Sequence, residues 1–169
     1  MENLNNNFEG YCDLLLKNIS RGAFLTVANE DRINTMTIGW GSLGHLWGKP
    51  ILMVMVRKSR FTYQLIEKSN EFTVSLPGEN QLKKELSYCG RNSGREVNKF
   101  EVCGLTPLEG KTIKTPIIGE ALLHFECKVV YKQEMDSREL NNKYMDRWYS
   151  DDDYHTMYYG EILTAYMKK

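Results

Sequence analysis

The residues best suited to chemistry are three cations and two hydroxyls in one short stretch, residues 57–62. Ser59 is a favourable N-cap residue, and the apolar spacing after it predicts a helix over 59–69. This helix carries no carboxylate before Glu67, so its positive side chains face the positive end of the helix dipole. An anion would balance that charge, and phosphate is the usual occupant. The alternative is a basic loop that faces solvent, and the local sequence does not separate the two.

A second set of anion donors lies in residues 90–95. Ser93 and Gly94 could present backbone amides to an oxyanion, and Lys99 adds a point charge shortly afterwards. The glycine patterns of P-loop and Rossmann proteins are missing from the chain. The two loops could converge on one phosphate, although nothing in the sequence itself brings them together.

Residues 34–40 suggest a place for the rest of such a ligand. The stretch combines an amide, two hydroxyls and a terminal Trp40. These groups suit a flat heteroaromatic ring, which needs hydrogen bonds at its edge and an apolar cover. The alternative is an ordinary half-buried strand that ends in a core tryptophan.

Other kinds of chemistry find little support. The three histidines have no metal-ligand spacing, and residues 151–153 lack the pattern of a calcium loop, which leaves a solvated acidic loop. No nucleophile motif is present. Cys89 lies beside arginines that could favour its thiolate, but a packed, inert thiol is the more common situation. We therefore predict no catalytic side chain and no metal site.

The elements that must position these residues follow from the apolar patterns. Alternation, apolar runs and turn residues predict many short strands and few helices, hence a mainly β closed antiparallel barrel with helical insertions. The predicted strands are 22–28, 33–38, 51–56, 72–76, 121–129 and 160–166; the predicted helices are 8–19, 59–69, 79–88 and 137–149; the predicted loops include 39–48 and 90–94. Residues 14–16 should form the buried side of the first helix, and 121–129 should have one wet face.

Composition bounds the remaining possibilities. The chain has 169 residues and a formal net charge of zero, which gives no global sign of nucleic-acid binding. We expect one domain over 1–169, with an N-terminal helical arm over 1–20 and a surface excursion over 134–158. The longest aliphatic run, 51–56, is too short to span a membrane, and no secretion signal is evident. Reduced cysteines and a cytoplasmic location are expected.

The order of several short motifs carries a resemblance across 22–166. The chain resembles the flavin reductase-like family of FMN-binding split barrels, which includes flavoredoxin-like proteins. The matching residues are Asn34-x-Met36-Thr37-Ile38-Gly39-Trp40, Pro50, Arg57-x-Ser59-Arg60-x-Thr62, Phe72-x-Val74-Ser75-x-Pro77, Cys89-Gly90-x-x-Ser93-Gly94-Arg95, Lys99-Phe100, Glu120-Ala121, Phe125-Glu126-Cys127 and Tyr159-Gly160-Glu161. Lys58 and Asn98 depart from the usual proline and aspartate.

The resemblance implies a six-stranded antiparallel Greek-key split β-barrel that pairs as a homodimer with FMN near the interface. It implies three sets of cofactor-binding residues: Ser59, Arg60 and Thr62 at the phosphate, helped by Ser93, Gly94 and Lys99; Asn34, Thr35, Met36 and Thr37 at the edge of the isoalloxazine, with Trp40 covering it; and backbone groups of Met55, Val56 and Arg57 at the pyrimidine side.

The function implied by the resemblance is a flavin reductase, in which NADH or NADPH passes a hydride to the flavin. The cofactor carries this chemistry, so no acid or base side chain is required. A second hypothesis is a flavoredoxin-type electron carrier that serves partner proteins without direct reaction with NAD(P)H. A third is a split barrel that binds no flavin, against which the anion donors at 59–62 argue.

Overall fold

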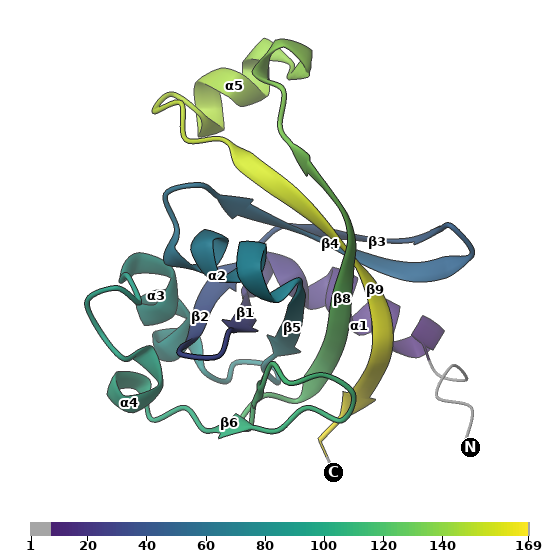
Figure 1. The fold of residues 1–169 in the computed structure, drawn as a ribbon, viewed down its shortest axis with the longest axis vertical. Helices are drawn as coiled ribbons and strands as arrows, with labels where there is room; N and C mark the ends of the chain where they lie inside the picture. The colour runs from purple at the N-terminus through teal and green to yellow at the C-terminus, as the bar shows by residue number, and fades with distance from the viewer. Residues whose placement is uncertain (1–7, 169) are drawn as a thin grey trace.

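The computed structural model describes residues 8–168, and its centre is one antiparallel sheet of seven strands (Figure 1). The strands lie in the order β2-β1-β5-β8-β9-β4-β3. Their bounds are Ala23–Ala28 (β1), Ile33–Ile38 (β2), Gly41–Leu46 (β3), Lys49–Arg57 (β4), Glu71–Leu76 (β5), Leu123–Glu134 (β8) and His155–Met167 (β9). A separate two-stranded sheet joins β6 (Pro107–Leu108) to β7 (Ile117–Ile118).

The helices lie around this curved sheet (Figure 1). They are α1 (Phe8–Asn18), α2 (Phe61–Ser69), α3 (Lys83–Arg91), α4 (Lys99–Cys103) and α5 (Asn142–Trp148), with two 3-10 turns at Ile19–Arg21 and Ser137–Glu139. Helix α2 packs against β1, β2, β4 and β5, and α3 packs against β1 and β2. Helix α5 stands away from the sheet, at the far end of the ribbon that β8 and β9 form (Figure 1).

The core lies between the sheet and its helices because the strands place apolar side chains there. Val54 and Val56 on β4 are fully buried, whereas Met53 and Met55, which alternate with them, are only half-buried. This alternation is that of a strand with one packed face. A wholly apolar run such as 51–56 suits a strand covered on both faces, but in the structure only one face of β4 is fully packed.

Several sequence predictions are confirmed by the strand pairing. Strands β1 and β2 form the expected hairpin, in which Ala23 lies opposite Ile38 and Ala28 opposite Ile33. Strands β4, β5 and β9 contain the predicted segments 51–56, 72–76 and 160–166, and β9 is longer at its beginning. The mainly β antiparallel fold with helices is thus confirmed.

The strand count and closure differ from expectation. The main sheet has seven strands rather than six, and it ends at β2 and β3 without a pairing that closes it. Residues 39–48 are not a loop, because Gly41–Leu46 pairs with β4 as an antiparallel edge strand. Glycines and exposed side chains along β3 give no periodic packing signal, which is why it was not predicted.

Two further expectations were wrong in detail. The first five residues of β8 are all buried, including His124 and Glu126, so its predicted wet face begins only at Lys128. In α1, Leu15 is buried but Leu16 is exposed. Residues 1–7 of the predicted N-terminal arm lie outside the described residues. No helix within 8–168 is long and apolar enough to cross a membrane.

Candidate functional site

A cavity of about 230 Å³ lies where β2, β4 and β9 meet the end of α5. Six of the predicted site residues line it: Met36, Thr37, Trp40, Met55, Arg57 and Arg60. Trp148 and His155 also line it, and the sequence analysis did not select either. His155 lies opposite Arg57 across the β4–β9 pair, so strand register places it there.

Aromatic rings form one side of the cavity. The rings of Trp40 and Trp148 meet edge to face with centroids 5.0 Å apart, and His155 lies 5.5 Å from Trp40. Trp40 is 38% exposed, so it is not a core tryptophan. A partly exposed tryptophan beside a cavity can cover a flat ring, and this is the role predicted for Trp40.

His155 is held neutral beside these rings. The hydroxyl of Tyr149 lies 2.8 Å from its Nδ1. Burial, together with the nearby charge of Arg57, lowers the pKa of His155 to about 4. The imidazole therefore adds hydrogen-bonding capacity to the cavity wall at pH 7 without adding a charge.

The N-terminal part of β2 connects the cavity to α2. Asn34 is buried and donates from Nδ2 to Thr62 Oγ1 at 2.9 Å. A Cβ added at Gly94 would overlap the amide oxygen of Asn34, so the 90–95 loop approaches β2 at a position that only glycine fits. Asn34, Thr62 and Gly94, which are far apart in the sequence, thus lie together.

The two predicted anion loops lie against one another. Arg60 donates from Nη1 to the carbonyl of Gly90 at 3.2 Å, and Arg95 donates to the carbonyl of Ser59 at 3.1 Å. Ser93 lies in the same loop, where its hydroxyl accepts from the amide of Arg95. The sequence alone could not establish that these two loops are in contact.

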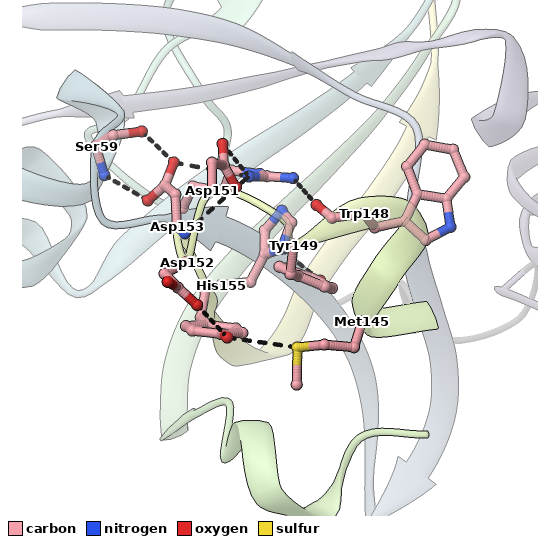
Figure 2. Close-up of polar contacts among 10 residues, drawn as sticks. Ser59, Met145, Trp148, Tyr149, Asp151, Asp152, Asp153 and His155 are labelled. Atoms are coloured by element: carbon pink, nitrogen blue, oxygen red, sulfur yellow. Dashed lines mark hydrogen bonds and ion pairs between the residues drawn. The ribbon is translucent and has the colours of Figure 1, made fainter. Parts of the chain in front are cut away.

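Ser59 does not cap the helix as the sequence predicted. Helix α2 begins at Phe61, its N-cap position is Arg60, and no side chain caps it. Ser59 instead gives both of its donors to Asp153: Oγ to Oδ2 at 2.5 Å and the backbone amide to Oδ1 at 3.3 Å (Figure 2). The extended backbone after Ser59 moves the start of the helix two residues onward.

Arg57 is held by the same acidic segment. It donates to Asp151 at 3.2 Å and to the carbonyl of Trp148 at 2.6 Å, and it lies 3.8 Å from Asp153. The prediction of a solvated loop at 151–153 holds in part: Asp151 and Asp152 are exposed, but two of the three carboxylates bind the cationic stretch. Only the fold brings these segments, 94 residues apart, together.

Three predicted residues point elsewhere. The side chain of Val56 is fully buried in the core. The hydroxyl of Thr35 bonds to Thr26 and to the carbonyl of Leu25. Lys99 is buried, and its Nζ donates to the carbonyls of Thr35 and Cys89, both at 2.9 Å.

Lys99 therefore joins β2 to α3. Burial, with a smaller effect from the charge of Arg60, lowers its pKa. Cys89 beside it is buried, and burial raises the pKa of its thiol to about 12. This is the environment of an unreactive thiol.

The donor set fits a ligand that carries a phosphate. The Ser59 amide and hydroxyl and the Arg57 guanidinium already hold a carboxylate, which stands in for an oxyanion. A larger open groove of about 1,490 Å³ borders Asn34, Gly94 and Lys99, but none of the three tryptophans lines it. We therefore place the candidate site at the smaller cavity.

Comparison with known sequences identifies a family. The profile of the flavin reductase-like domain matches residues 16–169. An uncharacterised protein of Archaeoglobus fulgidus is 31% identical over 140 residues, which cover 83% of this chain and 68% of that protein.

Solved structures are similar as well. Flavoredoxin from Methanosarcina acetivorans superposes with a TM-score of 0.70 at 27% identity, covering 88% of this chain and 68% of that one. A Shewanella frigidimarina protein described as having a split barrel domain gives a TM-score of 0.67 at 17% identity, covering 88% of this chain and 67% of that one. NADH:FAD oxidoreductase from Streptomyces globisporus C-1027 gives a TM-score of 0.67 at 19% identity, covering 92% of this chain and 83% of that one. The last two similarities concern the fold alone.

Proposed function

Because the chain belongs to the flavin reductase-like domain family, we propose that it binds FMN and acts as an oxidoreductase that transfers a hydride from NADH or NADPH to the flavin. The observation that carries the proposal is a cavity walled by aromatic rings directly beside anion donors that already hold a carboxylate. A flavin mononucleotide needs those two environments next to each other.

The proposed contacts fall into two groups. At the phosphate we propose Ser59, Arg60 and Thr62, together with the loop of Ser93 and Gly94. Lys99 would support this group through its bond to Cys89 in the last turn of α3, the helix that precedes the loop. At the ring system we propose Asn34, Met36 and Thr37 at the edge, Trp40 as cover, and Met55 and Arg57 at the pyrimidine side. For Thr35 and Val56 the proposal concerns backbone groups only, because the Thr35 hydroxyl is bonded to β1 and the Val56 side chain packs in the core.

Bound FMN would supply the hydride-accepting chemistry. The chain supplies position and charge. Arg57 and Arg60, both lining the cavity, would stabilise negative charge that develops there. Trp40 and Trp148 would keep water from the ring face, and neutral His155 would provide a hydrogen bond. No side chain has to accept or release a proton in this scheme.

The second candidate function is electron carriage between proteins. The similarity to a flavoredoxin at 27% identity favours it. In that case the flavin would exchange electrons with a partner protein and would not react directly with NAD(P)H.

One experiment separates these functions. The purified protein should be yellow, and denaturation should release flavin absorbance. Anaerobic addition of NADH or NADPH should bleach the flavin within seconds. Bleaching only by dithionite or a reduced ferredoxin would favour the carrier, and a colourless protein that takes up no added FMN would contradict both functions.

The proposal includes a homodimer, as the family resemblance implies, and a cytoplasmic location, as expected from the sequence. Sedimentation equilibrium at micromolar concentration should give twice the mass of the chain, 19.7 kDa, for the dimer. A monomer under these conditions, with FMN still bound, would contradict the dimer and leave the cofactor proposal standing.

A further inference from the structure

The acidic segment 150–154, which we call the acidic strap, lies against Ser59, one of the predicted phosphate donors (Figure 2). Asp153 accepts both hydrogen bonds that Ser59 can donate, and its carboxylate lies 3.8 Å from Arg57. Asp151 accepts from Arg57 Nη1 at 3.2 Å. The strap thus places two negative charges where the proposed ligand would bring its own.

A phosphate and Asp153 cannot occupy these donors together. Ser59 has one backbone N–H and one hydroxyl proton, and a single carboxylate receives both. Beyond the competition for donors, a carboxylate and a phosphate at one partly buried site repel each other. Arg57 and Asp153 are 19% and 23% exposed, so solvent screens this repulsion only in part.

The strap lies beside the cavity without lining it. Trp148 lines the cavity, and the strap follows Trp148 and Tyr149. Moving the strap away from Ser59 would therefore free the phosphate donors and leave the aromatic walls of the cavity in place.

The strap is suited to such movement. It connects α5, which stands outside the sheet, to the start of β9 (Figure 1). Asp151 is 64% exposed, and Asp152 has a left-handed φ of 57°, a conformation that Asp and Asn tolerate. Tyr149 is buried against His155 and would remain as an anchor below the moving part.

We propose that Asp153 is an intramolecular competitor of the flavin phosphate, and that it sets how far the protein prefers FMN over riboflavin, which lacks the phosphate. The inference rests on the proposed function, because it concerns the ligand of the same site. Phosphate binding displaces the carboxylate from Ser59, whereas riboflavin leaves it in place.

The test compares two flavins on the full chain freed of bound flavin. Dissociation constants for FMN and riboflavin are measured by flavin fluorescence quenching for the wild type, Asp153→Asn and Asp152→Asn. The control lies next to Asp153 and loses the same charge, but its carboxylate bonds to Tyr154 and not to Ser59. Asn also accepts the left-handed backbone at 152.

The expected result is specific to the phosphate. Asp153→Asn should bind FMN at least tenfold more tightly and should change riboflavin affinity less than threefold. Asp152→Asn should leave the dissociation constants for both flavins within twofold of the wild-type values. Asp153→Glu, which keeps the charge, should resemble the wild type. Asp153→Ser repeats the test if the asparagine variant folds poorly. An unchanged FMN-to-riboflavin ratio in Asp153→Asn would overturn the inference.

Inorganic phosphate separates failure of this inference from failure of the proposed function. If no variant binds either flavin, the proposed function fails, and phosphate affinity measured by calorimetry decides the role of Asp153. A phosphate affinity at least tenfold higher in Asp153→Asn than in the wild type would support competition at Ser59. Equal phosphate affinity in the wild type and Asp153→Asn would refute it.

Discussion

Arg60 and Lys58 carry the same charge two positions apart, but their side chains have different surroundings. Arg60 lines the cavity and donates to the carbonyl of Gly90, whereas Lys58 pairs with Glu134 at the surface. We expect Arg60→Ala to weaken FMN binding roughly ten- to hundredfold, since a hydrogen bond to a charged group contributes about 1.5–3 kcal/mol. Lys58→Ala should have little effect. Equal losses in a fluorescence titration would mean that the phosphate is held elsewhere.

Gly94 offers a second test at the same scale. We expect Gly94→Ala to destabilise the protein by about 1–3 kcal/mol, because its Cβ would overlap Asn34 and lie 3.1 Å from the ring of Phe61. Gly44→Ala is the matched control, since a Cβ there meets nothing within 4 Å. Urea denaturation of both variants measures the difference. Similar stabilities would show that Asn34 can move aside at little cost.

At the scale of the element, Glu126 fixes the loop between β6 and β7. Its carboxylate accepts backbone hydrogen bonds from Lys111, Thr112 and Ile113, and hydroxyl bonds from Thr112 and Tyr166. Burial alone would raise its pKa, but these hydrogen bonds outweigh burial and lower it. The stabilisation is therefore complete above the ordinary pKa of about 4.5 and is lost as the pH falls through the lower folded value.

Glu126→Gln should cost roughly 2–3 kcal/mol of unfolding free energy, because an amide NH₂ replaces an oxygen that accepts these bonds. Glu120→Gln is a suitable comparison, since Glu120 accepts from the amide of Thr106 and is more exposed than Glu126. Hydrogen exchange of residues 111–113 should also accelerate in Glu126→Gln. Unchanged exchange would contradict the assigned role of Glu126.

The elements differ in how well the sequence predicts them. Strands β2 and β5 were predicted because alternation is a local property of the chain, whereas the edge strand β3 has no alternation to detect. At the site, the anion donors were predicted by residue type. The contact of Ser59 with Asp153 was not, because it joins segments 94 residues apart and depends on the β4–β9 register. Trp148 and His155 were missed for the same reason.

For the whole molecule, two buried histidines predict how stability depends on pH. Burial is the main cause that lowers the pKa of both His124 and His155 from 6.5 to about 4. Between these values the unfolded chain binds protons that the folded chain does not, so stability should fall as the pH falls from 6.5 to 4. At about 1.4 kcal/mol per pKa unit, each histidine accounts for a loss of up to about 3 kcal/mol of unfolding free energy over this pH range.

Urea denaturation at several pH values measures this dependence. His124→Asn should reduce the slope of unfolding free energy against pH by about half between pH 6.5 and 5, above the ordinary carboxyl pKa of about 4.5, because one of the two histidine protonation differences is removed. An identical slope in the variant and the wild type would contradict the assignment to His124.

The ribbon of β8 and β9 has a consequence for evolution. One end of this ribbon belongs to the central sheet, while the other carries α5 and the acidic strap beyond it (Figure 1). Insertions or deletions among residues 135–154 would therefore change what covers the site while the packing of the sheet stays intact. Within such an architecture, one tip of the molecule can be remodelled while the rest is inherited unchanged.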